Sequence, residues 1–359
     1  MRICLIASEI FAWGKIGGFG RATRMVGREL VKRGVEVIAI TPRRNAQHPV
    51  EDLDGMRVLG FDPKNPFSAY RLYQQADADI YHSEEPSFST FLAMKAMPRR
   101  KHLITFQDTR RVEDWLVNLH YPSLNRMQVL TDWLYEDSPF TRYAIHHSDG
   151  LFAAARFLIP RAREIYHLRR DPGFLPNPVY LPKEINKSVV PVVSFISRLD
   201  RLKRPELFFQ LAHSFPEVRF VVAGQSRDPV YGQFLSEQAA CLPNLSMRGF
   251  IDPFENNDLS GLLGQTWILA NTSPKEGLPN VFIEAAAHKC AILSSVDPGG
   301  FTTNYGVHVD GDDFGAGLRK LLDHDYWRVQ AGKGYEYVSS TFSADKSIDQ
   351  HIRIYQSSL

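Results

Sequence analysis

Short apolar runs alternate with longer segments of helical periodicity along almost the whole chain. This alternation is typical of βαβ units, in which helices cover both faces of a parallel sheet. In the first half the expected strands are 2–7, 35–41, 80–82, 102–106 and 151–154. In the second half they are 190–196, 219–223, 245–247, 267–270 and 291–294. The pattern therefore predicts an α/β protein built on parallel sheets.

The length of the chain indicates two domains. A chain of 359 residues is too long for one ordinary hydrophobic core. Residues 178–189 are proline-containing and have no clear period, which favours a linker. We expect Rossmann-like domains over 1–177 and 190–340 that face each other across a cleft. We expect the remaining helix, 341–359, to pack back on the first domain.

Composition narrows the class of protein. The hydrophobic fraction of 44% is ordinary for a globular chain, and a net charge of +2 does not favour a nucleic-acid partner. The scattered Cys4, Cys241 and Cys290 lack metal-ligand spacing, so a reducing, cytoplasmic compartment is expected. No apolar run is long enough to cross a bilayer, so any membrane contact would be peripheral. The basic groups 99–101 and 110–111 are either solvated surface or contacts for anionic lipid or an anionic acceptor.

The strongest local signal is the segment 273–285, which follows an expected strand and runs into an Ala-rich helix. It carries two carboxylates, Glu276 in the loop and Glu284 inside the helix. The helix terminus between them favours an anion, and glycine allows close backbone approach. The expected donor-binding residues are therefore Gly277, Leu278, Pro279, Asn280, Val281 and Glu284. A loop carboxylate and a solvated helix residue are the alternative, which the apolar neighbours of Glu284 disfavour.

A second signal, 197–203, lies directly after the expected strand 190–196. Arg198 could grip a pyrophosphate with its planar fork, and Lys203 could add a point charge. Taken alone, the segment would be an ordinary mixed-charge surface loop.

A third signal, Lys15-Ile16-Gly17-Gly18-Phe19-Gly20, lies between the first strand and the first helix. Gly17 and Gly18 could let backbone amides approach a phosphate or a sugar. The spacing differs from the dinucleotide pattern Gly-x-Gly-x-x-Gly, which argues against a nicotinamide cofactor. The alternative is a tight turn that requires glycine.

Together these segments resemble the retaining glycosyltransferases of family 4, which have the GT-B architecture. The resemblance implies that Glu276 contacts the donor sugar and Glu284 the ribose, while Arg198 and Lys203 neutralise the diphosphate. It also implies that the Gly17-Gly18 turn closes on the donor. The chain departs from the family pattern at Gln107, where members often carry His, and at Lys289 and Ala291, where Gly and Pro are usual.

The resemblance implies a retaining transfer of a sugar from a nucleotide-sugar donor to an acceptor. The catalytic residues would be Glu276, Arg198 and Lys203, with no cofactor and no required metal. The acceptor would be a glycan, a lipid-linked molecule or a small molecule. Two alternatives stay open: a nucleotide-sugar epimerase, and a nucleotide-sugar-binding protein without turnover.

Overall fold

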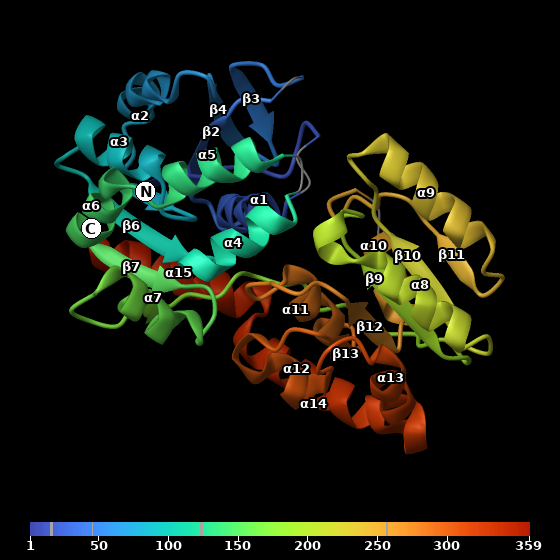
Figure 1. Cartoon of the computed structure of the whole chain (residues 1–359). Coiled ribbons are helices and arrows are strands. Elements are labelled where there is room, and N and C mark those ends of the chain that lie inside the picture. Colours follow the sequence, from blue (N-terminus) through green and yellow to red (C-terminus); the bar gives the residue numbers. More distant parts are fainter. Residues whose placement is uncertain (15–16, 45, 123–124, 256–257) are drawn as a thin grey trace. The chain divides into compact units, whose positions relative to one another are not determined.

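The chain folds into two compact units, each an α/β structure around a mainly parallel sheet (Figure 1). The computed structural model describes residues 1–14, 17–44, 46–122, 125–255 and 258–359. Unit 1 comprises Met1–Arg111, Leu130–Pro178 and Ala344–Leu359, and unit 2 comprises Val112–Val129 and Val179–Ser343. The α/β class with two parallel-sheet domains, which the alternation predicts, is confirmed.

The described part of unit 1 contains an eight-stranded sheet in the order β3-β4-β2-β1-β5-β6-β7-β8. Neighbouring strands are parallel except for the antiparallel pair β3 and β4. The order reverses between β1 and β5, as in doubly wound sheets. The strands are β1 (Arg2–Ile6), β2 (Glu36–Pro42), β3 (Val50–Leu53), β4 (Met56–Phe61), β5 (Ile80–Ser83), β6 (Lys101–Phe106), β7 (Gly150–Ala153) and β8 (Gly173–Phe174).

Helices cover both faces of this sheet. Val26 and Leu30 of α1 pack with Ile348 and Tyr355 of α15 on one face, while side chains of α2 and α3 form a second core on the other. The helices of unit 1 are α1 (Gly18–Lys32), α2 (Ala69–Ala76), α3 (Phe88–Ala96), α6 (Pro139–His147), α7 (Leu158–Tyr166) and α15 (Ala344–Ser358), with the 3-10 turn η1 (Pro66–Ser68). Apolar side chains at helical spacing therefore bury the parallel strands on both sides.

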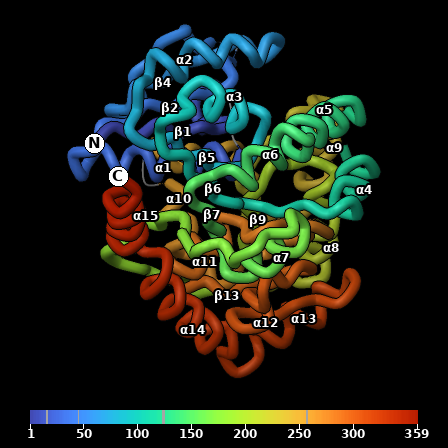
Figure 2. Tube along the Cα trace, turned by 90° about the vertical axis from the view of Figure 1, so that its left-hand side faces the viewer, coloured from blue at the N-terminus to red at the C-terminus, as the bar shows by residue number. Residues whose placement is uncertain are grey.

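The C-terminal helix α15 belongs to unit 1, so both chain termini lie close together in that unit (Figures 1 and 2). Its Tyr355 hydroxyl lies 2.7 Å from Nδ1 of His82, at the end of β5. Its Ser347 hydroxyl donates to the carbonyl of Pro176. These contacts fix the last helix to the segment through which the chain leaves unit 1.

The described part of unit 2 contains a six-stranded parallel sheet in the order β11-β10-β9-β12-β13-β14. This order, with its reversal between β9 and β12, is that of nucleotide-binding doubly wound sheets. The strands are β9 (Val192–Ile196), β10 (Arg219–Ala223), β11 (Leu245–Met247), β12 (Ile268–Asn271), β13 (Ala291–Ser294) and β14 (Gly306–His308).

The core of unit 2 is aromatic and aliphatic. Phe195, Phe208 and Phe220 are fully buried, and Trp267 stacks on Trp327 with ring centroids 4.6 Å apart. The surrounding helices are α8 (Pro205–Ser214), α9 (Pro229–Ala240), α10 (Asp258–Gln265), α11 (Asn280–Ala287), α12 (Phe301–Tyr305), α13 (Phe314–Leu322) and α14 (Tyr326–Thr341), with the 3-10 turns η2 (Arg201–Lys203), η3 (Pro298–Gly300) and η4 (Asp323–Asp325). Helix α4 (Val112–His120) clusters with unit 2, and α5 (Arg126–Glu136) begins in that unit and ends in unit 1. None of the described helices is both long and apolar enough to span a bilayer.

Candidate functional site

The candidate site of unit 2 lies where the strand order reverses, at the carboxyl ends of β9 and β12. Ligands of open α/β sheets bind at this position, because the loops leaving the two strands separate there. Ser197 to Lys203 follow β9, and Thr272 to Glu276 follow β12. The topology alone therefore brings two of the segments singled out in the sequence to one place.

The loop after β9 is shaped by a carboxylate cap and by a glycine. Asp200 Oδ1 accepts a hydrogen bond of 3.1 Å from the backbone N–H of Lys203, which starts the turn η2. Arg198 Nη2 lies 3.5 Å from Asp200 Oδ2. Gly224, which follows β10, has a φ of +147°, and a Cβ there would lie 1.8 Å from the carbonyl oxygen of Ser197. Only glycine permits this approach.

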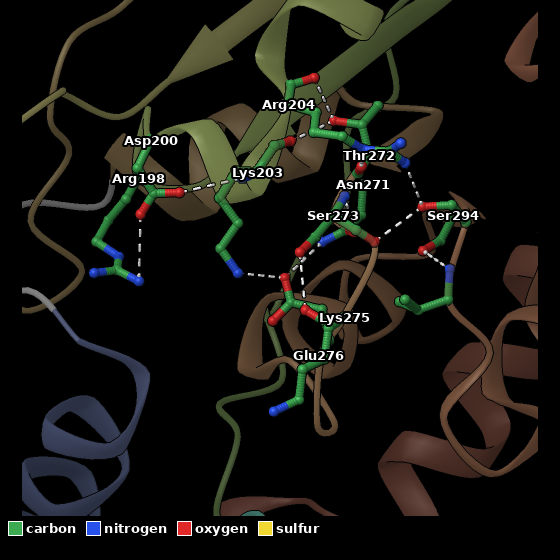
Figure 3. Close-up of polar contacts among 12 residues, drawn as sticks. Arg198, Asp200, Lys203, Arg204, Asn271, Thr272, Ser273, Lys275, Glu276 and Ser294 are labelled. Atoms are coloured by element: carbon green, nitrogen blue, oxygen red, sulfur yellow. Dashed lines mark hydrogen bonds and ion pairs between the residues drawn. The ribbon is translucent and has the colours of Figure 1, made fainter. Parts of the chain in front are cut away.

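The loop after β12 is held by Asn271, the last residue of that strand. Its Oδ1 accepts from the backbone N–H of Ser273 at 3.0 Å, and its Nδ2 donates to Glu276 Oε1 at 3.3 Å. The Ser273 hydroxyl donates to the carbonyl of Lys275 at 2.9 Å. These contacts fold the loop back on itself and aim the Glu276 carboxylate toward η2 (Figure 3).

An ion pair between Lys203 Nζ and Glu276 Oε1 joins the two loops (Figure 3). The two side chains are 12% and 15% exposed, so the pair is shielded but still reaches solvent. Arg198 is 29% exposed and is linked to this pair through Asp200. The structure thus brings two predicted cations of one loop, Arg198 and Lys203, to the predicted acid Glu276, which is 73 positions from Lys203 in the sequence.

Arg204 and Thr272 brace the same two loops from behind. Arg204 adopts φ +47°, and its Nε donates to the carbonyl of Thr272 at 2.7 Å. The Thr272 hydroxyl donates in return to the carbonyls of Lys203 and Arg204 at 2.6 and 2.9 Å. Arg204 Nη1 also lies 2.9 Å from Asp312. The sequence analysis did not assign a role to four of these bracing residues, Asp200, Asn271, Arg204 and Thr272. Of the four, only Asp200 carried a local signal, because an Asp directly before a short turn is a typical cap.

Helix α11 begins at Asn280, directly after the Glu276 loop. Pro279 occupies the N-cap position, and among the described residues no side chain caps this terminus. The predicted donor-binding residues Gly277 to Val281 are half-buried. Glu284, one turn inside the helix, is only 7% exposed. The arrangement gives the positive end of a helix dipole beside a cationic loop, which favours a bound anion.

Gly17 and Gly18 lie in unit 1, at the start of α1, while Lys15 and Ile16 lie outside the described residues. The Glu9 carboxylate reaches this helix start, because Oε1 accepts from the N–H of Gly20 at 3.1 Å. A Cβ on Gly17 would lie 1.8 Å from that carboxylate oxygen. A larger residue at position 17 would therefore displace the Glu9 side chain from the start of α1.

Gln107 follows β6 of unit 1, and its side-chain amide is engaged within that unit. Its Nε2 donates to Asn177 Oδ1 at 3.1 Å and to Glu84 Oε2 at 3.2 Å, and its Oε1 accepts from Asn177 Nδ2 at 2.7 Å. The backbone N–H of Gln107 donates to Glu85 Oε2 at 2.7 Å. Gln107 therefore joins the loops after β5 and β6 to the segment that leaves the unit.

Burial determines the charge of the cluster that His82, Glu84, Glu85 and Gln107 form at the ends of β5 and β6. It raises the pKa of Glu84 to about 7, although the hydrogen bond from Gln107 acts to lower it. It also raises the pKa of Glu85 well above its usual range. The pKa of His82 is lowered to about 3 by burial and by the neighbouring His351, so its imidazole is neutral at pH 7. The cluster in unit 1 is thus far less charged than its residue types suggest.

Two such units, each with the doubly wound strand order, define a class of two-domain α/β proteins whose ligands bind at the carboxyl ends of the strands. Residues 16–183 match the family model described as Glycosyltransferase Family 4, and residues 181–311 match that of Glycosyl transferases group 1. The chain belongs to the GT-B glycosyltransferases. This confirms the family and the GT-B architecture that the sequence indicated.

Similar proteins of known structure share the fold across the whole chain. Sucrose-phosphate synthase of Thermosynechococcus elongatus is 16% identical over 99% of this chain and 98% of its own, with a TM-score of 0.75. HepE of Anabaena, in complex with UDP-glucose, is 15% identical over 99% of this chain and 100% of its own, with a TM-score of 0.72.

A comparison of sequences gives a shorter match. Glycogen synthase of Anaeromyxobacter dehalogenans is 41% identical over 49 residues, which are 14% of this chain and 10% of that relative.

Proposed function

We propose that this glycosyltransferase moves a sugar from a nucleoside-diphosphate sugar to an acceptor with retention of the anomeric configuration. The observation that carries the proposal is the Lys203–Glu276 ion pair at the carboxyl ends of β9 and β12. It sets a cation and an acceptor-only carboxylate beside the start of α11, where a diphosphate and a sugar hydroxyl could bind together.

Each residue of the site has one role in this proposal. Arg198 and Lys203 neutralise the diphosphate, aided by the N–H groups at the start of α11. Glu276 accepts hydrogen bonds from hydroxyls of the donor sugar, and Glu284 those of the ribose. The acceptor is a glycan, a lipid-linked molecule or a small molecule. A uridine-diphosphate sugar is the first donor to test, because the similar HepE was solved with UDP-glucose.

In a retaining transfer the leaving diphosphate gains negative charge as its bond to the sugar breaks. Preorganised cations and amides stabilise that charge, and losing one such contact commonly costs about 10²–10³ in rate. We propose that the acceptor proton passes to the leaving phosphate on the same face of the sugar. The proposal includes no required metal, and the persistence of activity in EDTA tests this.

Incubating the protein with UDP-, GDP- and ADP-sugars, with and without candidate acceptors, tests the proposal. We expect nucleotide release that depends on an acceptor, persists in EDTA and gives a product of unchanged anomeric configuration by NMR. Isomerisation of the donor without an acceptor would instead identify an epimerase. Binding without any conversion would identify a nucleotide-sugar-binding protein, and an inverted product would exclude retention.

The double variant Arg198→Ala with Lys203→Ala tests the assignment of the site. We expect it to lose at least about 100-fold in kcat/KM for the donor, since both diphosphate cations are removed. Arg201→Ala is the matched control. Arg201 is a cation of the same turn, but its guanidinium carbon lies 4.7 Å from the centroid of the Tyr231 ring and is not part of the Lys203–Glu276 pair. Unchanged activity in the double variant would reject the site.

A further inference from the structure

An aromatic cluster lies on the surface of unit 1, outside the site described above. Phe88 and Phe91 of α3 contact Phe67 of η1 and Phe140 of α6, with ring centroids 5.0–6.0 Å apart. Tyr143 of α6 adds an edge-to-face contact with Phe91 at 5.7 Å. Helix α3 lies between α2 and α6 in contact with both, so one surface carries all these rings (Figure 1).

The outer members of this cluster are open to solvent. Phe67 is 66% exposed and Phe140 50%, and the amphipathic Tyr143 and Tyr70 are 40% and 37% exposed. Phe88 and Phe91 beneath them pack on the buried core formed by α2, α3 and the sheet. Contiguous exposed apolar side chains of this kind commonly mark an interaction surface.

The segments that carry these rings contain no acid. Residues 63–76, 86–101 and 139–147 hold seven Lys or Arg and no Asp or Glu. Acids from outside these segments pair with three of the cations: Asp77 with Arg100, Asp149 with Lys101 and Asp137 with Arg142. The exposed cations Lys64, Arg71, Lys95 and Arg99 form no ion pair within the described part of the chain.

Aromatic and basic groups are interleaved on this surface. Lys95 Nζ lies 4.4 Å from the centroid of the Tyr143 ring and 3.2 Å from the Tyr143 hydroxyl. The same ring stacks on His147 at 3.9 Å, so its faces are already used within the protein. Because the other rings also pack against one another, this surface is less suited to stacking a sugar or a nucleic-acid base than to lying against an apolar layer.

We propose that this surface, here called the aromatic-basic face, docks on an anionic lipid bilayer. The face consists of the exposed rings and cations named above: Phe67, Tyr70, Phe140, Tyr143, Lys64, Arg71, Lys95 and Arg99. Exposed Phe and Tyr side chains partition into the headgroup boundary, where one end of the ring is apolar and the other wet. Unpaired cations beside them attract anionic headgroups. The inference concerns binding alone and does not depend on sugar transfer.

Sedimentation of the full chain with vesicles tests this directly. We expect binding to vesicles of phosphatidylcholine mixed with phosphatidylglycerol, weakening as salt is raised because the attraction is partly electrostatic. Binding to pure phosphatidylcholine vesicles should be much weaker. Absence of binding to the anionic vesicles would overturn the proposal, as would binding to heparin or RNA but not to vesicles.

Two double variants locate the surface. Phe67→Ser with Phe140→Ser removes the exposed rings, and Arg71→Gln with Arg99→Gln removes two unpaired cations. We expect each to weaken vesicle binding by roughly tenfold or more. The matched control is Phe234→Ser with Lys333→Gln, an exposed ring and an exposed cation of unit 2.

Unchanged binding in both double variants would overturn the assignment of the face. All of these side chains are exposed, so we expect the circular dichroism spectra and Tm of the variants to match those of the parent. Because sedimentation measures binding without turnover, its outcome is independent of whether the chain transfers a sugar.

Discussion

The two units share the doubly wound strand order but differ in the side chains that they place at the carboxyl ends of their central strands. At the carboxyl ends of β9 and β12, unit 2 sets Arg198, Lys203 and Glu276 as charged, partly exposed side chains. At the carboxyl ends of β5 and β6, unit 1 buries Glu84 and Gln107 in a hydrogen-bonded cluster with little charge.

The difference separates two uses of the carboxyl ends of central strands in a doubly wound sheet. A charged pair that reaches solvent can exchange its partner for a ligand, because its groups are already solvated in part. A buried amide whose donors and acceptors are all engaged cannot exchange them without leaving a polar group unsatisfied. We therefore assign ligand chemistry to the position in unit 2 and a bracing role to the one in unit 1.

Glu276→Gln should give the largest effect. The change keeps the shape of the side chain but removes the charge that pairs with Lys203 and the acceptor-only oxygens proposed to hold the sugar. We expect kcat/KM for the donor to fall by about 10²–10³. Steady-state kinetics with a saturating acceptor measure this, and exposed Glu217→Gln on the same unit is the control.

If kcat/KM for the donor fell by less than about threefold in Glu276→Gln, the proposed difference between the two units would be contradicted. It would mean that the ion pair only braces the loops, like the amide cluster of unit 1.

Much of the fold could be predicted from the sequence, because buried parallel strands are continuous apolar runs. All ten expected strands are present with bounds shifted by at most two residues. The hairpin β3–β4 was missed although Asp54-Gly55, with φ +55° and +81°, forms its turn. Strand Val50–Leu53 carries two acids, so no apolar run marked it.

The site could be predicted only in its parts. The 197–203 and 273–285 segments stood out because glycines, cations and acids followed apolar strands. That Lys203 meets Glu276, 73 positions away, depends on β9 lying beside β12, which no local spacing reveals. Gln107 was noted as a departure, yet its partners Glu84 and Asn177 are brought to it by tertiary structure alone.

Glu84→Gln should change how stability depends on pH. The pKa of Glu84 is raised from 4.5 to about 7 in the folded chain, so the native state binds its proton more tightly than the unfolded state does. Between those two values a rise in pH therefore lowers the free energy of unfolding of the parent. The isosteric amide lacks this titration and can still accept from Gln107.

The stability of Glu84→Gln relative to the parent should therefore rise from pH 4.5 to 7, by about 3 kcal/mol in total. Urea unfolding at a series of pH values measures it. His82, His351, Glu85 and Tyr355 titrate in the same cluster but are present in both proteins, so their contributions largely cancel. Exposed Glu184→Gln is the control, and a difference that stays flat with pH would show that Glu84 is not buried as described.

Gln107→Ala should give a smaller effect, on stability rather than on catalysis. It removes the amide that bonds to Glu84 and Asn177, leaving both partners less satisfied, which costs about 1–3 kcal/mol in the free energy of unfolding. A double-mutant cycle with Asn177→Ala should give a coupling energy of about 1 kcal/mol, since the two side chains share two hydrogen bonds. Exposed Gln75→Ala, on α2, should change stability by less than about 0.5 kcal/mol. If Gln107→Ala instead left stability unchanged and lowered kcat by tenfold or more, Gln107 would be a substrate contact, and the carboxyl ends of the central strands would carry ligand chemistry in both units.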